Sequence, residues 1–444
     1  MFNNFFTKGR EALPKLPSKV YAKLDKIEDA SDALGTDLTF VYFDAVDATW
    51  FNEFRHPLIQ TKHDQNRQRA LLEKAPISIV VGKKHLLFPD TGLEEGAWYF
   101  LEFDKGDVPI EQHFGLLEAA TERLMTRPIA LSGELDKDLG KAFSLDAIPD
   151  ATENDIRQTL SRCSQDIQGV AVYDVGQGNC TALLTSINHP VPAVYFDFGG
   201  GALANKKTFP NALKQFCTSY KPPVILSHWD WDHWSSAQRD LRIIEHDWIV
   251  PRQEMGAIHR VLAANIQAKG RLLIYPMTVP RVDVNQLSLR QCGIWLRRNI
   301  RNRNDTGLAL IVRKRNRRIL LPGDARYRAI FGRNLPSFTA LVTPHHGADT
   351  KSYRVPTPDF SSANRVAYSY GKNNTFNHPR QVTISNHLKE NWDKPLSTAC
   401  SGAAANRQPN HLVLTFDGSY RYRSGMVLSP PCGNLGCQLE LVDG

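Results

Sequence analysis

Short runs of apolar residues recur along the second part of the chain, and each run stops abruptly at a polar or turn-forming residue. Runs of this kind, bounded by turn residues, are typical of buried strands. They cover residues 170–173, 193–196, 224–226, 318–321 and 340–342. Residues that follow several strands of a sheet scaffold can meet at one edge. The pattern therefore predicts one functional site assembled from these strand ends.

The first part of the chain has a different pattern. Apolar and polar residues alternate at 39–43 and 77–81, which predicts two strands, while apolar residues three and four apart over 111–124 predict a helix. The segment 145–155, with a proline and several acidic residues, is expected to be a linker. We predict an α/β protein that comprises a smaller α+β region of unknown role (1–165), a larger domain (166–425) and a peripheral tail (426–444).

The composition is that of an ordinary globular protein. Of the 444 residues, 42% are hydrophobic and 23% are charged, which excludes collagen-like, coiled-coil and wholly disordered chains. The net charge of +8 is a mild bias toward polyanions. No run of about 18 apolar residues, no signal-peptide core and no CxxC pair occurs in the sequence. We therefore expect a cytoplasmic protein that does not associate with a membrane.

The most informative segment is His-Trp-Asp-Trp-Asp-His at 228–233, directly after an apolar run. Four side chains of metal-binding type lie within these six residues: His228, Asp230, Asp232 and His233. For this segment alone, a polar loop with helix-capping aspartates is the alternative interpretation. Two other strand endings add Asp324, whose two oxygens can bridge a pair of ions, and the pair His345 and His346. Together the endings predict a metal site.

These motifs resemble the metallo-β-lactamase-fold hydrolases. The resemblance rests on Asp-Val-Gly-Gln-Gly at 174–178, the HxDxDH box at 228–233, Leu-Pro-Gly-Asp at 321–324, Pro-His-His-Gly at 344–347, and the segment 370–379. It is closest to the hydrolase domain of ComEC-like DNA-uptake proteins, and the phosphorylcholine esterases are also similar. It implies an αββα sandwich over about 165–425, with two divalent ions at the rim of the sheets.

The resemblance also implies a role for individual residues. His228 and Asp230 would hold one ion, Asp232, His233 and His346 the other, and Asp324 would bridge them. Asp232, His345 and His378 would act in catalysis, with the two histidines facing the scissile phosphate. Asp174 and Asp305 would support the ligands from behind.

The sequence departs from the family pattern at three places. Asp230 replaces the usual histidine of the box, the stretch 304–307 offers only oxygen atoms where many members supply a further histidine, and Asn179 replaces an acid. The ligand set is therefore rich in carboxylates. Harder oxygen ligands shift the metal preference from zinc toward manganese or magnesium, although zinc stays possible.

A dinuclear site with an activated bridging water suits hydrolysis of a phosphodiester, and we expect a nucleic acid or nucleotide substrate. Arg313, Arg315 and Arg317 form a basic hairpin turn that would contact distant phosphates of a polymer, or would be simply solvated. Three tryptophans interleave the ligands and either pack or stack on a base or a quaternary ammonium: Trp229, Trp231 and Trp234.

Two other functions stay open from the sequence. One is a non-catalytic module that binds nucleic acid or a protein partner, and the other is a small-molecule hydrolase similar to the phosphorylcholine esterases. Residues 1–165 could contact a protein partner. A role in antiviral defence is suggested only by the architecture.

Overall fold

The computed structural model describes most of the chain. The described residues are 16–30, 38–60, 65–88, 94–163, 166–187, 191–213, 215–294, 296, 302–351, 354–359, 364–392, 395–399 and 409–423. They form two compact units, which we call the N-terminal unit (Met1–Pro149 with Gln253–Lys269) and the C-terminal unit (Asp150–Arg252 with Gly270–Gly444). The division after Pro149 lies within the expected linker 145–155. The C-terminal turn segment 429–433 lies outside the described residues.

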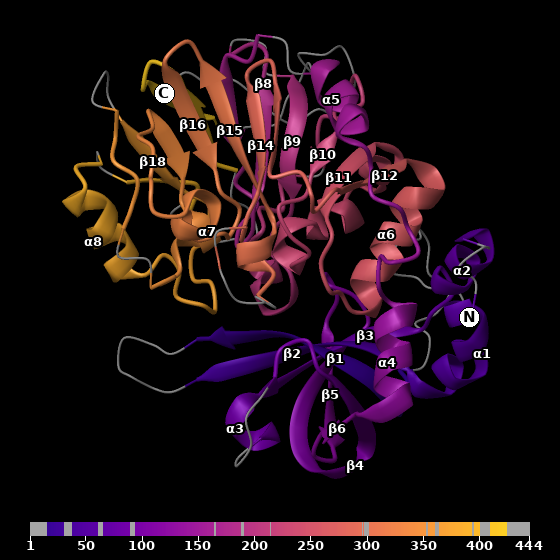
Figure 1. Cartoon of the computed structure of the whole chain (residues 1–444). Coiled ribbons are helices and arrows are strands. Elements are labelled where there is room, and N and C mark those ends of the chain that lie inside the picture. Colours follow the sequence, from indigo (N-terminus) through magenta and orange to yellow (C-terminus); the bar gives the residue numbers. More distant parts are fainter. Residues whose placement is uncertain are drawn as a thin grey trace. The chain divides into compact units, whose positions relative to one another are not determined.

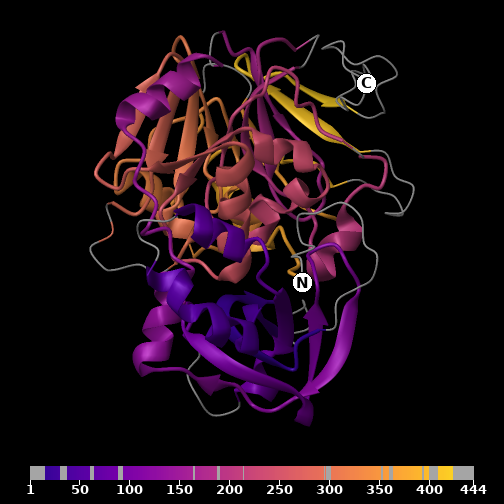
Figure 2. The same cartoon turned by 90° about the vertical axis from the view of Figure 1, so that its right-hand side faces the viewer.

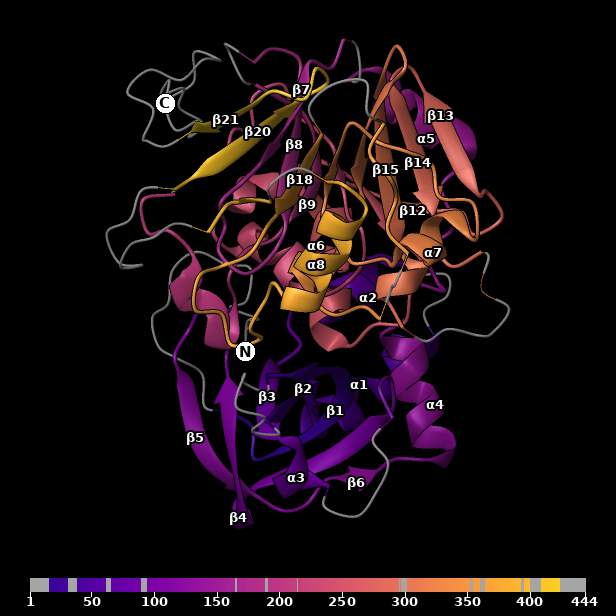
Figure 3. The same ribbon diagram turned by 90° about the vertical axis from the view of Figure 1, so that its left-hand side faces the viewer.

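The N-terminal unit is built on an antiparallel sheet (Figure 3). Its strands are β1 (Lys19–Asp29), β2 (Thr39–Asp47), β3 (Ile77–Lys83), β4 (Trp98–His113), β5 (Ala120–Met125) and β6 (Ile129–Ala130). They pair in the order β1-β2-β3-β4-β5, with β6 on β4, and β1 also pairs with β4. The helices of this unit are α1 (Ala48–Gln60), α2 (Gln65–Leu72), α3 (Lys84–Leu87), α4 (Gly133–Ala142) and α6 (Ala257–Lys269). The strands predicted at 39–43 and 77–81 are confirmed as parts of β2 and β3.

The helix predicted over 111–124 is wrong. This segment contains the end of β4, a turn and most of β5, and its backbone pairs with neighbouring strands, as at Gln112 with Thr121. The apolar residues with helical spacing do not share a buried face, because Leu116 is fully buried while Leu124 is 50% exposed. Pairing of β4 with β3 and β5 therefore decides the structure over the local periodicity.

Helix α6 is attached to the sheet of its own unit by buried polar groups. Both carboxylate oxygens of Asp44 lie 2.9 Å from the backbone N–H of Ile258, in the first turn of the helix. Nε2 of His259 lies 3.1 Å from Oδ1 of Asp25. A carboxylate at a helix N-terminus satisfies donors that the helix itself leaves unpaired. These contacts explain how residues 253–269 join the N-terminal unit.

The C-terminal unit contains two mixed sheets (Figure 1). The eight-stranded sheet has the order β12-β11-β10-β9-β8-β7-β20-β21 and the seven-stranded sheet the order β13-β14-β15-β16-β17-β18-β19. The strands of the first are β7 (Gly169–Val172), β8 (Cys180–Leu184), β9 (Pro192–Phe198), β10 (Val224–Ile225), β11 (Asp247–Pro251), β12 (Arg271–Tyr275), β20 (His411–Thr415) and β21 (Tyr420–Arg423). Those of the second are β13 (Arg281–Val284), β14 (Leu287–Gln291), β15 (Leu308–Lys314), β16 (Arg317–Leu321), β17 (Ala340–Val342), β18 (Arg365–Tyr368) and β19 (Leu396–Ser397). In Figure 2 the pair β20–β21 is the yellow ribbon.

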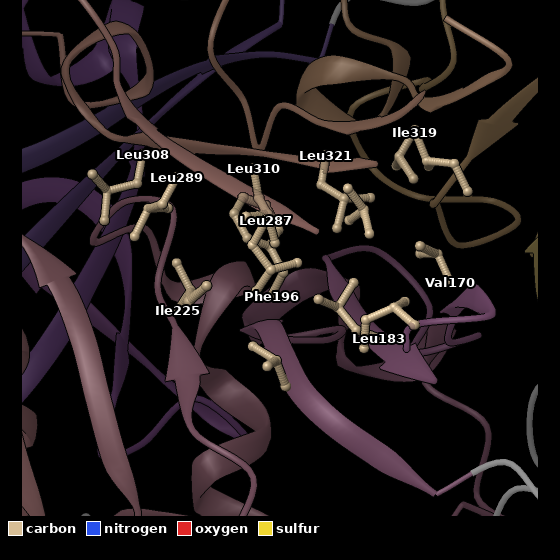
Figure 4. Packing of buried hydrophobic residues seen from close by; sticks show 14 of the residues in the cluster. Val170, Leu183, Phe196, Ile225, Leu287, Leu289, Leu308, Leu310, Ile319 and Leu321 are labelled. Carbon is tan, nitrogen blue, oxygen red and sulfur yellow. The ribbon is translucent and has the colours of Figure 1, made fainter. Parts of the chain in front are cut away.

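The two sheets pack face to face, as the resemblance implies. One continuous core contains alternate residues of both sheets, among them Phe196 and Ile225 from the first and Leu310 and Leu321 from the second (Figure 4). Helices α7 (Tyr327–Phe331) and α8 (Gln381–Lys389) pack on the other face of the seven-stranded sheet. Helix α5 (Glu153–Ser161) also contributes to the core between the sheets. Among the described residues, no helix has both the length and the apolar character needed to cross a bilayer.

A buried histidine of α8 should make the stability of this unit depend on pH. Nδ1 of His387 lies 2.8 Å from the carbonyl oxygen of Thr383 and Nε2 lies 2.8 Å from the hydroxyl of Tyr327, a pattern that suits the neutral ring. Burial lowers the pKa of His387 from 6.5 to about 4. The unfolded chain takes up this proton at a higher pH than the folded chain, so stability falls as the pH drops through this window.

We expect wild type to lose about 3 kcal/mol more than His387→Gln between pH 7 and pH 4, since each pKa unit corresponds to about 1.4 kcal/mol. Urea unfolding of both proteins at the two pH values measures the difference. All other titrating groups are common to the pair and cancel. Equal losses in the two proteins would show that His387 does not carry this pH dependence.

Candidate metal centre

The predicted ligands come together where several strands of the C-terminal unit end. The box at 228–233 follows β10 and includes the short helix η3 (Trp231–His233). Asp324 follows β16, and His345 and His346 lie in the turn η7 (Pro344–Gly347) after β17. The side chains of His228, Asp230, His233, Asp324 and His346 are buried and that of Asp232 is nearly so. The strand endings therefore build one site, as the sequence pattern predicts.

The first set of donors, which we call the Asp232 group, consists of Asp232, His233, His346 and one oxygen of Asp324. Nε2 of His233 lies 3.0 Å from Oδ1 of Asp324 and 4.0 Å from Oδ1 of Asp232. Nε2 of His346 lies 3.1 Å from Oδ2 of Asp232 and 3.9 Å from Oδ1 of Asp324. Four donors thus surround one small space.

The second set, the Asp230 group, consists of His228, Asp230 and the other oxygen of Asp324. Nε2 of His228 lies 3.4 Å from Oδ2 of Asp230 and 3.8 Å from Oδ2 of Asp324. Nε2 of His345 lies 3.6 Å from the same Asp324 oxygen. Asp324 therefore turns one oxygen to each group, which is the arrangement of a bridging carboxylate.

Three imidazoles present a nitrogen lone pair to this space. Nδ1 of His346 lies 2.9 Å from the carbonyl oxygen of Ser369, and Nδ1 of His233 lies 2.8 Å from Oδ2 of Asp197, so in each ring Nδ1 carries the proton. The hydroxyl of Ser227 donates to Asp197 and can accept from Nδ1 of His228 at 3.0 Å. A metal-ligating histidine has this arrangement, with its outer N–H held by a carboxylate or carbonyl group.

The site chemistry fits divalent ions. Within the described part of the chain, Nε2 of His228, His233 and His346 and both oxygens of Asp324 are buried and make no hydrogen bond. Donors around a tetrahedral ion at about 2.1 Å lie about 3.4 Å from one another. The donor separations of 3.0–4.0 Å in the Asp232 group are of this size. A cation between them would remove the repulsion of lone pairs that face each other.

The electrostatics of the protein alone show the same need for positive charge. Burial would raise the pKa of Asp324, but the neighbouring imidazoles of His233, His345 and His346 hold it well below its usual value. Burial would lower the pKa of His233, but the carboxylates of Asp324 and Asp197 raise it well above its usual value. The Asp324 carboxylate is therefore ionised, and a cation, either a proton or a metal ion, is favoured beside it.

Asp197 is a site residue that the sequence interpretation missed. It lies near the end of β9, is fully buried, and accepts hydrogen bonds from the backbone N–H of Ser227 at 2.6 Å and from the amide of Asn179 at 2.8 Å, besides its contact with His233. Asn179 therefore supports the ligands, because its amide donates to a carboxylate where an acid could not. The strand ending at Asp197 is visible in the sequence, but nothing there assigns it this contact.

The HxDxDH loop is held against glycines from other strand ends. The carbonyl oxygen of Asp232 accepts from the N–H groups of Asn179 at 3.0 Å and Gly200 at 3.2 Å. A Cβ on Gly199 would lie 1.7 Å from that same oxygen. Only glycine leaves room for this close approach, so Gly199 helps to place Asp232.

We expect Gly199→Ala to destabilise the protein by about 3 kcal/mol or more, because overpacking forces the backbone apart, and to weaken metal binding through Asp232. Urea unfolding and titration with Zn²⁺ measure the two effects. Gly140→Ala is the matched control, since nothing lies within 4 Å of a Cβ there and helix α4 favours alanine. Equal behaviour of the two variants would contradict the role of Gly199.

The histidine pair is held in a strained turn. His345 and His346 have φ angles of 49° and 54°, in the left-handed region, and Gly347 follows with 87°. A left-handed conformation costs a residue with a side chain about 1–2 kcal/mol. Hydrogen bonds to neighbouring loops offset this cost, since the N–H of His345 donates to Gly323 and that of Arg380 to Gly347. Strain of this kind clusters at functional sites.

His378 and Asp174 lie around the centre. The His378 ring is 5.6 Å from that of His345, and its Nδ1 lies 3.3 Å from the amide nitrogen of Gln177. The carboxylate of Asp174 accepts from the N–H groups of Gly176 and Asn410, which ties the 174–178 loop to the chain just before β20. The contact between His378 and a substrate stays a prediction.

The stretch 302–307 approaches the centre through residues other than Asp305. The buried carboxylate of Asp305 accepts from the N–H of Arg326 at 3.0 Å and from its Nε at 2.7 Å. This contact anchors the stretch, while Nη2 of Arg303 lies 2.9 Å from Oδ1 of Asp230. Asn304 also approaches His345, with Nδ2 3.4 Å from Nδ1. The sequence indicates that residues 304–307 offer only oxygen atoms to the centre. The structure shows that the guanidinium of Arg303, directly before this stretch, also reaches it.

The basic hairpin turn lies away from the metal ligands. The predicted hairpin is confirmed as β15 and β16, with its turn at the opposite end of β16 from Asp324. The turn is shorter than predicted, because Arg313 and Arg317 belong to the paired strands and only residues 315 and 316 connect them. Arg313 lies 3.7 Å from Asp283, which partly balances its charge, and Arg315 is exposed. Contact of Arg313, Arg315 and Arg317 with nucleic acid stays a prediction. The three tryptophans in and directly after the box are buried, so they pack and do not offer a face for a ligand: Trp229, Trp231 and Trp234.

Comparison with known proteins identifies the domain that contains these ligands. Residues 224–359 match the family model described as Metallo-beta-lactamase superfamily. This segment contains the six side chains of the predicted ligand set. The chain therefore carries a metallo-β-lactamase superfamily domain with a buried His/Asp cluster that resembles a dinuclear metal site. A search of curated proteins finds no match.

Three solved structures illustrate the similarity to known proteins, with TM-scores between 0.24 and 0.32. The metallo-beta-lactamase fold protein YhfI from Bacillus subtilis is 9% identical, with a TM-score of 0.28, and the match covers 53% of this chain and 98% of that chain. Tm1679, a metal-dependent hydrolase of the beta-lactamase superfamily, is 11% identical, with a TM-score of 0.32, and the match covers 56% and 99%. CmlA, a diiron beta-hydroxylase from Streptomyces venezuelae, is 12% identical, with a TM-score of 0.24 and coverage of 60% and 49%.

Proposed function

We propose that the protein is a metal-dependent hydrolase that cleaves phosphodiesters in nucleic acids or nucleotides. The observation that carries this proposal is the orientation of Asp324, whose two oxygens face two separate groups of donors. A carboxylate shared in this way serves a pair of ions. When bound, such a pair lowers the pKa of water and neutralises charge that develops on a phosphorus centre.

The chain's own residues support an anionic substrate. Arg303 brings a guanidinium to Asp230, and His345, whose Nε2 lies 3.6 Å from Asp324, has its ring 5.6 Å from that of His378. A guanidinium and imidazoles are groups that bind phosphoryl oxygens or transfer a proton to a leaving oxygen. The side chain of His345 is 18% exposed, more than that of any predicted ligand, so His345 is accessible to a substrate. We assign it to substrate positioning or proton transfer.

The tryptophans of the box do not support a phosphorylcholine-type substrate. Recognition of a quaternary ammonium needs an open aromatic face. The indoles of the HxDxDH box are buried, and Nε1 of Trp229 donates to the carbonyl oxygen of Pro251 at 3.0 Å. These tryptophans stiffen the loop. The phosphodiester proposal, including its likeness to the ComEC-type hydrolases, therefore leads over a choline ester.

A substrate panel tests the proposal. Purified protein loaded with Mn²⁺, Zn²⁺ or Mg²⁺ is assayed with single-stranded DNA, RNA, bis-p-nitrophenyl phosphate and p-nitrophenyl phosphorylcholine. We expect turnover of the diesters that EDTA abolishes. Hydrolysis of the phosphorylcholine ester alone would select the small-molecule alternative. Salt-sensitive DNA binding that EDTA does not affect, without turnover of any ester, would select the non-catalytic module.

A further inference from the structure

The Asp230 group has a largely buried arginine, Arg303, beside one of its carboxylates. The two oxygens of Asp230 have different neighbours. Oδ2 lies 3.4 Å from Nε2 of His228, within the Asp230 group, and Oδ1 lies 2.9 Å from Nη2 of Arg303. The side chains of Asp230 and Arg303 are only 4% and 10% exposed. The ion pair is therefore shielded from water, where the attraction between opposite charges is strong.

Arg303 is held in this place by its own segment. The adjacent helix η6 (Asn304–Thr306) is anchored through the buried Asp305, whose carboxylate binds Arg326. The N–H of Leu308, at the start of β15, donates to the carbonyl oxygen of Ser227, directly before the box. The guanidinium is thus held beside Asp230 by a segment that is anchored directly after it, and it is not an exposed surface group.

The contact between Arg303 and Asp230 lowers the negative charge that the Asp230 group offers to a cation. Asp230 is the carboxylate that belongs to the Asp230 group alone, since Asp324 is shared, and Arg303 compensates its charge. A guanidinium cannot lose its proton in a protein, so the compensation persists at every working pH. In the Asp232 group, Asp232 faces the imidazoles of His233 and His346, which are neutral when they bind a metal.

We propose that Arg303 makes the two metal positions unequal. The Asp232 group binds a divalent ion first and tightly, whereas the Asp230 group binds its ion weakly because the guanidinium shares Asp230 with that ion. Arg303 is a positioning residue in this proposal, since it acts on the ion through Asp230. The donors of the Asp230 group still fit an ion, and the difference between the groups is one of affinity.

Metal titration of the full-length protein tests this inference without any substrate. Metal-free protein is titrated with Mn²⁺, followed by calorimetry and by the electron paramagnetic resonance signal, which distinguishes isolated from coupled Mn²⁺ pairs. For wild type we expect two steps whose affinities differ at least 10-fold, with the coupled signal appearing only in the second. Arg303→Gln, which keeps a polar side chain and removes the charge, should tighten the second step at least 10-fold and leave the first unchanged.

Two further variants separate charge from structure. Arg303→Lys keeps the positive charge and should keep the second step weak. Arg281→Gln removes an exposed arginine of β13 and should leave both steps as in wild type. If Arg303→Gln weakens the second step or leaves it unchanged, Arg303 does not compete with the ion and the proposal is wrong. Two equal steps in wild type would also overturn it.

The outcome is independent of the proposed function. A protein that binds two ions with unequal affinity and hydrolyses no ester keeps this inference and loses the phosphodiesterase proposal. A protein that hydrolyses diesters with two equal metal steps does the reverse.

Discussion

Asp324→Asn is expected to lower kcat/KM for a phosphodiester roughly 1000-fold or more and to remove the dinuclear metal signal. The carboxylate faces both donor groups, with Oδ1 3.0 Å from His233 and Oδ2 3.8 Å from His228. An amide keeps the size of the side chain, but it has no charge and offers one oxygen in place of two. Because paired ions stabilise a transition state by several kcal/mol, losing one of them costs about three powers of ten.

The measurement combines steady-state kinetics on bis-p-nitrophenyl phosphate with elemental analysis of the dialysed protein. Asp283→Asn is the matched control, since Asp283 is a partly exposed carboxylate of β13 whose partners include Arg281 and Arg313. We expect this control to keep the metal content and the activity of wild type. An Asp324→Asn protein with two bound ions and normal turnover would falsify the bridging role.

Asp197→Asn is expected to weaken metal binding about 10–100-fold, the usual effect of removing a group that orients a metal ligand. Its carboxylate accepts from the ring of His233, from Asn179, and from both the backbone and the hydroxyl of Ser227. An asparagine would turn its own N–H groups toward one or more of these donors. A buried donor without an acceptor costs about 1–3 kcal/mol, so unfolding should also become easier by a similar amount.

A second buried aspartate separates these two effects. Asp240 accepts hydrogen bonds from the N–H of Phe216 and from the guanidinium of Arg242, and it is buried, with 5% of its surface exposed. Asp240→Asn should reduce the free energy of unfolding and leave the Zn²⁺ affinity close to that of wild type. If both variants bind Zn²⁺ equally well, the orientation of His233 does not depend on Asp197.

Much of the site could be predicted from the sequence because its signals are local. The residues of the HxDxDH box are adjacent in the chain, and Asp324 and His346 each follow an apolar run that ends in a turn. Such runs become strands of one sandwich, and their ends meet. The convergence of the ligands and the two mixed sheets therefore followed from the pattern of strand endings and from the family resemblance.

Local patterns failed where a partner strand or a distant segment decides the structure. Residues 111–124 have helical spacing but form strands, because the backbone of β4 pairs with β3 on one side and β5 on the other. Likewise, nothing near His259 in the sequence shows that it meets Asp25, more than 200 residues earlier, and thereby joins the N-terminal unit.

The sequence by itself determined which side chains can hold metal ions and in which order the strands deliver them. Only the tertiary structure decided which groups stand behind those ligands, namely Asp197 behind His233 and Arg303 beside Asp230. The physical reason is that a ligand motif is a property of neighbouring residues, whereas the proton position and charge of each ligand depend on contacts between strands that are far apart in the chain. We propose that these contacts also set how strongly each half of the centre would hold an ion.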